Sequence, residues 1–245
     1  MLKRSVLATP PLFLSATPAL AMAGMTAGSW WDPLDHYCER VAPGLLGEPL
    51  NAFTNLFFIL AAGVAIVAQG DRRTRGDTGL LGVAALVASI GVGSLLFHTF
   101  ANRWSLIADI APIAIFLYAF LFVALRRFLA LGPWLAGAVT MALAASSPLI
   151  TTSLAPVLGA SASYFPGFVI TFGIAAAVRL ILGKPVPWLL VAAGAAFSIA
   201  LVFRTTDQEL CRVWPYGSHF LWHSFNALSV GFGLFAIDRH GSKRR

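Results

Sequence analysis

One long stretch of the chain, residues 128–178, contains no charged residue, and this feature strongly limits the possible folds. A transmembrane helix needs about 20 mostly apolar residues, because the hydrocarbon core is about 30 Å thick and an α-helix rises about 1.5 Å per residue. The uncharged stretch is too long for one such helix. Its polar, proline-containing part, TTSLAPVLGASASYFPG, predicts a turn between two crossings.

The composition supports a membrane protein. Hydrophobic residues make up 58% of the chain and charged residues only 11%, and the mean hydropathy is +0.79, whereas a soluble domain carries about 25% charged residues. We therefore predict an all-α membrane protein, a seven-transmembrane helix bundle. Its predicted spans are residues 50–68, 79–99, 105–125, 133–150, 163–180, 187–203 and 216–237.

The N-terminal residues resemble a secretory leader. Lys3 and Arg4 precede an apolar stretch that ends in Ala-Leu-Ala and Ala-Met-Ala, which are similar to signal-peptidase sites. Three prolines in this stretch disfavour a stable spanning helix. We expect residues 1–24 to be a leader and residues 25–245 to form the seven-transmembrane domain. The alternative is an uncleaved first span.

The basic residues are distributed unequally between the two predicted sides of the membrane. One side holds Arg72, Arg73, Arg75, Arg126, Arg127, Arg179, Lys184, Arg239, Lys243, Arg244 and Arg245, and the other holds Arg40, Arg103, Arg204 and Arg212. Because basic loops stay in the cytoplasm, we predict a cytoplasmic C-terminus and an outer N-terminus, in a multi-pass protein of the bacterial inner membrane. Topology thus explains the net charge of +7, and neither nucleic-acid binding nor a protein partner is indicated.

Four ionisable residues fall at one depth within the predicted spans. His98 lies near the outer end of the second span, Asp109 near the outer start of the third, and His219 and His223 near the outer start of the seventh. Residues four apart share a helix face. His219 and His223 have this spacing, and so do Ser94 and His98. Such residues are costly in lipid and usually mark function.

These residues predict a metal site near the non-cytoplasmic face. Three histidine ligands leave a fourth position for water, as in catalytic zinc sites. Other interpretations are hydrogen-bonded core histidines, haem ligation by two of them, and a proton relay through Asp109 and His98. The two cysteines, Cys38 and Cys211, flank predicted spans, and they pair if both face an oxidising compartment; otherwise both are free thiols.

Three blocks of the chain resemble the alkaline ceramidases, seven-span hydrolases of the superfamily that also contains the adiponectin receptors. The blocks are CERVAPGLLGEPLNAFTN, GVGSLLFHTFANRWSLIADIAP and DQELCRVWPYGSHFLWH. The first is similar to the family's Cys-Glu and Glu-x-x-Asn-x-x-x-Asn, the second to its Gly-Ser-x-x-x-His with a later Asp, and the third to its Asp-x-x-x-Cys and His-x-x-x-His. The chain departs from the family at Ile110, where the family has Glu, and at Val41, where it has Asn.

The resemblance implies a zinc-dependent amidase that hydrolyses the N-acyl bond of ceramide-like membrane lipids. Zinc is then held by His98, His219 and His223. Asp109 acts as the catalytic acid and base, and Ser94 donates a hydrogen bond to the oxyanion. The resemblance also implies a Cys38–Cys211 disulfide, and a calcium ion bound by Asp35, Glu39 and Glu48, although Asp35 is one residue further from Cys38 than in the family.

Two other functions fit the same residues. A metal-containing receptor or structural bundle would bind lipid without hydrolysing it, and a proton-coupled transporter would use Asp109 as a relay. The clustering of the polar residues at one face disfavours transport, because a transport path has to cross the membrane. The sequence does not distinguish ceramide from phytoceramide or another N-acyl lipid.

Overall fold

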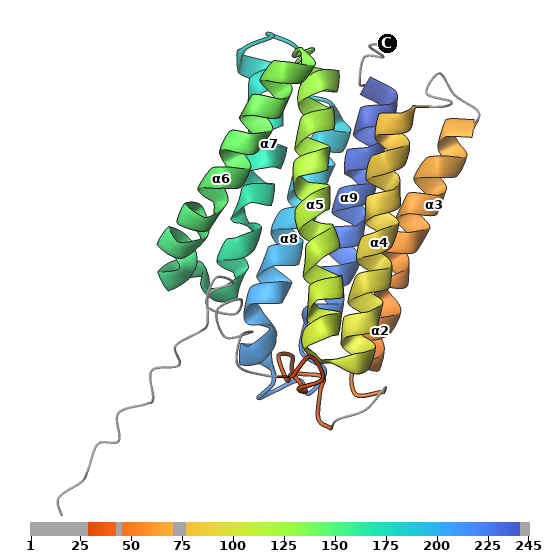
Figure 1. The fold of residues 1–245 in the computed structure, drawn as a ribbon, viewed down its shortest axis with the longest axis vertical. Helices are drawn as coiled ribbons and strands as arrows, with labels where there is room; N and C mark the ends of the chain where they lie inside the picture. The colour runs from red at the N-terminus through yellow and green to blue at the C-terminus, as the bar shows by residue number, and fades with distance from the viewer. Residues whose placement is uncertain (1–28, 43–45, 71–76, 241–245) are drawn as a thin grey trace, which may run out of the picture.

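The computed structural model describes residues 29–42, 46–70 and 77–240 (Figure 1). These residues form helices and loops without a β-strand, so the predicted all-α class is confirmed for them. The predicted leader, residues 1–24, lies outside the described residues. The elements in chain order are α2 (Pro49–Thr54), α3 (Leu56–Gly70), α4 (Thr78–Phe100), α5 (Arg103–Phe128), α6 (Pro133–Leu158), the 3₁₀ helix η1 (Gly159–Tyr164), α7 (Phe165–Leu180), α8 (Trp188–Leu210) and α9 (His219–His240).

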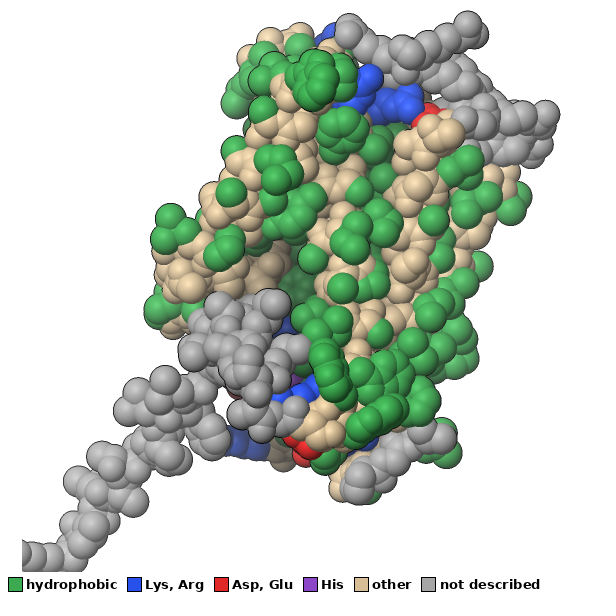
Figure 2. Space-filling view, viewed as in Figure 1, with side chains coloured by type: hydrophobic (Ala, Val, Ile, Leu, Met, Phe, Trp, Pro, Cys, Tyr) green, Lys and Arg blue, Asp and Glu red, His purple; other side chains and the backbone are tan. Residues whose placement is uncertain are grey.

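The long helices lie side by side in one bundle (Figure 1). Six helical segments in the described part of the chain are long and apolar enough to cross a membrane. Hydrophobic side chains cover the middle of the visible face, and charged side chains gather toward its two ends (Figure 2). These features are those of an integral multi-pass membrane protein.

The predicted turn of the uncharged stretch begins later than expected. Helix α6 continues to Leu158, past Pro148 and Pro156, and η1 then leads into α7. Prolines are tolerated in membrane helices, where neighbouring helices and local adjustments satisfy the freed backbone groups. Gly159, at φ 54°, ends α6 in a conformation that favours glycine. Residues Pro133–Leu180 count as one of the six apolar segments, so seven crossings remain a prediction.

A tight turn joins α4 to α5. Ala101 ends α4 with a left-handed backbone, and Asn102 caps α5 through a reciprocal pair of hydrogen bonds with Ser105. The loop before α2 packs on this turn, because the Leu34 N–H donates to the Ala101 carbonyl over 2.7 Å. The end of α4, the start of α5, the start of α9 and residues 29–42 therefore lie at the same end of the bundle (Figure 1).

The opposite end is held by an ion pair. Asp77 caps α4 by accepting from the Leu80 N–H, and its carboxylate lies 2.5 Å from the Arg127 guanidinium near the end of α5. Between the two ends, buried apolar residues of α3, α4, α5, α8 and α9 form a continuous core. Helices α4 and α5 are thus fixed to each other at both ends, which leaves little freedom for the residues between.

Candidate metal centre

Three histidines from two helices meet in the interior of the protein. His98 comes from the last two turns of α4, and His219 and His223 occupy the first two turns of α9. Their exposed fractions are 0%, 2% and 2%. One ring nitrogen from each lies within 4.8 Å of the others, so the group could hold a metal ion. The structure therefore brings together the three residues that the sequence predicts as ligands.

Two of the rings are oriented through their Nδ1 atoms. His98 Nδ1 lies 2.5 Å from Oε2 of Glu48, and His223 Nδ1 lies 3.1 Å from the Thr54 hydroxyl. His98 Nε2 and His219 Nδ1 are buried without a hydrogen-bond partner. Buried polar atoms are rarely left unpaired. Orphaned imidazole nitrogens in a three-histidine group fit a bound cation, and the partners on Nδ1 are those that orient metal-binding histidines.

Glu48 is held in place by its other neighbours. Arg40 Nε lies 2.5 Å from Oε1, and the Asn51 side chain donates to Oε2 over 3.0 Å. Arg40 also donates to the backbone carbonyl of His98 over 3.1 Å. Although burial acts to raise the pKa of Glu48, hydrogen bonds from His98, Asn51 and Arg40 lower it below its usual value. Glu48 is thus a carboxylate at neutral pH and a strong acceptor for His98.

Tyr37 covers one side of the histidine group. Its ring stacks on His219, with centroids 3.7 Å apart and an interplanar angle of 24°. Burial raises the pKa of Tyr37 well above its usual value, so the phenol stays neutral. This contact fixes the plane of the His219 ring, which has no hydrogen-bond partner on Nδ1.

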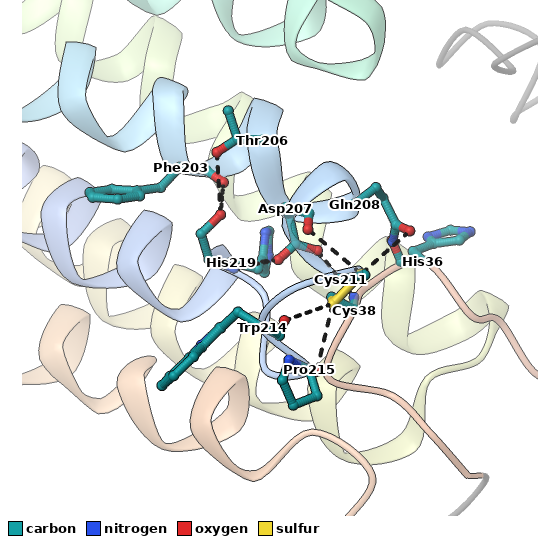
Figure 3. Close-up of a disulfide and its surroundings, with 11 residues drawn as sticks. His36, Cys38, Phe203, Thr206, Asp207, Gln208, Cys211, Trp214, Pro215 and His219 are labelled. Carbon is teal, nitrogen blue, oxygen red and sulfur yellow. Dashed lines mark hydrogen bonds between the residues drawn. A yellow bond between two sulfur atoms is a disulfide. The ribbon is translucent and has the colours of Figure 1, made fainter.

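The start of α9 is fixed by Asp207 and a disulfide (Figure 3). The Asp207 carboxylate accepts from the backbone N–H groups of Ser218 at 2.7 Å, His219 at 2.9 Å and Cys38 at 3.1 Å. The N–H groups of Ser218 and His219 are donors that the N-terminus of α9 leaves unpaired, and the Cys38 N–H comes from the loop that packs on it. Cys38 and Cys211 form a disulfide, as predicted, with Cα atoms 5.4 Å apart. Both links attach residues 29–42 to α8 and α9.

Asp109 and Ser94 lie beside the histidines. Both line a small cavity of about 10 Å³ together with His219 and His223, and Ser94 is close enough to Asp109 for a side-chain hydrogen bond. Asp109 Oδ1 is buried without a partner. The cavity has about the room that one water molecule requires. A carboxylate, a hydroxyl and a candidate metal group thus share the same small polar space.

A larger apolar cavity of about 500 Å³ adjoins the small one. Ile90, Ile113, Tyr164 and Asn226 line both. The large cavity lies among α5, α7, α8 and α9, and Figure 2 shows a recess with hydrophobic walls between α5 and the α6–α7 side of the bundle. Its volume is within the range of roughly 300–1,000 Å³ that is typical of ligand sites. An apolar molecule in it would reach the polar cavity at one end.

The predicted calcium ligands have other partners. Glu39 is buried, and its two carboxylate oxygens accept from the backbone N–H groups of Leu50 and Asn51 at 2.7 and 2.8 Å. Burial raises the pKa of Glu39, and these two hydrogen bonds act to lower it. Glu48 is paired as described, and Asp35 is exposed. Calcium binding at these residues remains a prediction.

Five residues of the site were not predicted from the sequence as parts of it. Tyr37, Arg40, Asn51 and Thr54 contact the histidines or Glu48, and Asp207 fixes α9. The positions of Thr54 and Glu48 offered a signal: both flank the start of the first apolar span, at the depth of the histidines. Tyr37 and Arg40 offered none, because their contacts depend on how the loop folds over α9.

The described residues define an all-helical protein with helices apolar enough to cross a membrane and a buried three-histidine group that could hold a metal ion. No family model matches the chain, and no curated protein matches it significantly. The resemblance to the alkaline ceramidases rests on the three sequence blocks.

Proposed function

We propose that the protein is a zinc-dependent amidase of the alkaline ceramidase family that hydrolyses the N-acyl bond of ceramide-like lipids to a sphingoid base and a fatty acid. The observation that carries this proposal is the junction of two cavities. A polar one is lined by His219, His223, Asp109 and Ser94, and an apolar one of about 500 Å³ opens beside it. An acyl chain in the apolar cavity would present its amide to the polar one.

The proposed topology has seven crossings, with the N-terminus outside and the C-terminus in the cytoplasm of a bacterial inner membrane. Helices α6 and α7 then count as separate crossings, joined by η1. The eleven basic residues on one side, against four on the other, support this orientation. It would put the histidine group near the non-cytoplasmic face, where the amide of an outer-leaflet lipid lies.

Zinc is the metal that best fits three imidazoles, and such an ion polarises a carbonyl and lowers the pKa of a water molecule to about 7. Glu48 and Thr54 hold two of the imidazoles in position through Nδ1. Asp109, with one oxygen free of partners, accepts the proton of the attacking water and donates it to the leaving amine. Ser94 donates a hydrogen bond to the oxygen that gains charge.

The test is the release of labelled fatty acid from a ceramide by the purified protein in detergent, with the zinc content measured in the same sample. We expect turnover in the wild type, none in Asp109→Asn, and neither turnover nor bound zinc in His223→Ala. His240→Ala is the matched control, because His240 is exposed at the far end of α9. Ser94→Ala tests the proposed oxyanion donor. Its control is Ser198→Ala, because Ser198 lines neither cavity.

The outcomes also separate the rival functions. Bound zinc and bound lipid without release of fatty acid would indicate a receptor or structural bundle. A protein without metal whose solute uptake follows a pH gradient would indicate a transporter. Full activity and full zinc content in His223→Ala would exclude the proposed site.

A further inference from the structure

A partly buried arginine that the proposed mechanism does not use lies beside the site. Arg204 belongs to α8, three residues before Asp207, whose carboxylate accepts from the N–H of His219. Because residues three apart are neighbours on a helix surface, Arg204 is one turn of α8 deeper than this contact. It therefore lies at about the depth of the histidine group.

The guanidinium is enclosed by aromatic rings. Its central carbon lies 4.5 Å from the ring centroid of Tyr164 and 5.8 Å from that of Trp222. One terminal nitrogen donates to the Ser161 hydroxyl over 3.2 Å, and Nε is buried without a partner. The hydroxyls of Ser161 and Tyr164 and the two rings satisfy only part of a group that has five N–H donors.

No carboxylate among the residues that the structure describes lies within ion-pair distance of Arg204. Asp207, the nearest acid in its own helix, is occupied by three backbone N–H groups. A cation withdrawn from solvent is normally paired with an anion, and Arg204 is partly buried, with its Nε atom fully so. Asp109 acts on Arg204 only at longer range, so no carboxylate of the described residues is in contact with the guanidinium.

The surroundings of Arg204 open into both cavities. Tyr164 and Trp222, the two rings against the guanidinium, line the polar cavity that holds Asp109 and His219, and Tyr164 also lines the apolar cavity. Arg204 is thus separated by one layer of side chains from the place where the proposed amide would lie. A lipid whose acyl chain fills the apolar cavity would bring the amine part of its head close to this arginine.

We propose that Arg204 binds an anionic group on the amine part of the substrate, a carboxylate or a phosphate. This inference rests on the proposed function for the position of the amide. The planar guanidinium presents paired donors that match the two oxygens of either anion. The preferred substrates are then N-acyl lipids with an acidic head, such as an N-acyl amino acid or a phosphorylated ceramide.

The experiment measures binding, so that it does not depend on turnover. The protein is Asp109→Asn in detergent, and the probes share one oleoyl chain: N-oleoylglycine with a carboxylate, N-oleoylethanolamine phosphate with a phosphate, and neutral N-oleoylethanolamine. We expect at least one of the two anionic lipids to bind roughly tenfold or more tightly than the neutral one, a difference of about 1.4 kcal/mol. The comparison of the two anions identifies the preferred headgroup.

Variants of Arg204 then test the assignment. Arg204→Gln, added to the Asp109→Asn protein, should remove the preference for anionic lipids. It should leave the affinity for the neutral lipid unchanged. Arg204→Lys keeps the charge without the planar fork, and should retain only part of the preference. Arg212→Gln is the matched control, because Arg212 is exposed just beyond the end of α8, and it should leave the preference intact. The unchanged affinity for the neutral lipid shows that a variant is folded.

Two results would overturn the inference: equal affinity for neutral and anionic lipids, or a preference that survives in Arg204→Gln. Turnover of the same lipids by the wild type separates this inference from the proposed function. Hydrolysis of neutral and acidic lipids at equal rates would support the amidase and reject the role of Arg204. A binding preference that depends on Arg204, without hydrolysis of any lipid, would support the role of Arg204 and reject the amidase.

Discussion

Glu48 Oε2 lies 2.5 Å from His98 Nδ1, although the two residues are 50 positions apart in the chain. Both are buried, with exposed fractions of 1% and 0%. The same carboxylate accepts from Arg40 and Asn51. A buried carboxylate thus holds the one histidine of the three that α4 provides, and Nε2 of that histidine is left without a hydrogen-bond partner.

Replacing Glu48 by Gln should weaken metal binding. The amide keeps the shape of the side chain but loses the negative charge that holds the His98 ring in position. The loss of such a partner typically lowers metal affinity about 10–100-fold. Competition for zinc with a chelator of known affinity measures the change. Glu39→Gln is the control, because the bonds of the Glu39 carboxylate among the described residues are to the backbone N–H groups of Leu50 and Asn51 and not to a histidine. Equal zinc affinity in Glu48→Gln and the wild type would contradict the prediction.

Zinc should stabilise the folded protein through the three histidines. A ligand that binds only the folded state at 100 times its Kd contributes about 2.7 kcal/mol. Removing metal with a chelator should therefore lower the Tm in detergent, and added zinc should restore it. In His219→Ala the restoration should be largely lost, whereas the exposed His240→Ala should respond as the wild type does. A Tm that is independent of zinc in the wild type would count against the metal site.

The disulfide should contribute to stability because it closes a long loop. Cys38 and Cys211 are 173 residues apart, and removing a native disulfide from a small secreted domain typically costs about 2–5 kcal/mol. The double variant Cys38→Ser/Cys211→Ser should show a lower Tm than the wild type under oxidising conditions. Adding a reductant should lower the Tm of the wild type and leave that of the double variant unchanged. Equal Tm values for the two proteins would show that the Asp207 hydrogen bonds alone hold this loop.

The helical class and the histidine group could be predicted from the sequence because both depend on local pattern. Apolar length gives the helices, and the spacing of His219 and His223 gives one face of one helix. The position of His98 beside them required only that the outer ends of two spans meet. A bundle with hydrophobic outer surfaces offers few alternatives for such costly residues.

The loop contacts could not be predicted, because they depend on tertiary packing. Glu48 was interpreted as a calcium ligand from its sequence block, but in the structure it pairs with Arg40 and His98. The stacking of Tyr37 on His219 depends on the neighbouring Cys38, which is held by the disulfide and by the hydrogen bond from the Cys38 N–H to Asp207. No periodicity encodes such contacts. The length of α6 was also missed, since its two prolines signal a turn in water but are tolerated in lipid.

Gly93 offers a test of how the helix packing positions Ser94 and Asp109, the proposed catalytic groups. It precedes Ser94 in α4, and a Cβ atom at this position would overlap the backbone carbonyl of Ala108, the residue before Asp109. The two helices approach this closely only because the side chain is absent. Gly93→Ala should therefore push α5 away from α4, lower the Tm, and reduce turnover more than zinc binding, because all three histidines lie outside α5.

Gly82→Ala is the matched control for this change. Gly82 lies in the same helix, and a Cβ atom there would meet nothing within 4 Å. Because alanine favours helix over glycine by about 0.5–1 kcal/mol, Gly82→Ala should keep or raise the Tm and leave turnover unchanged. Thermal unfolding, zinc content and fatty-acid release are measured for both variants. Full turnover in Gly93→Ala would mean that the separation of Ser94 and Asp109 does not limit the reaction.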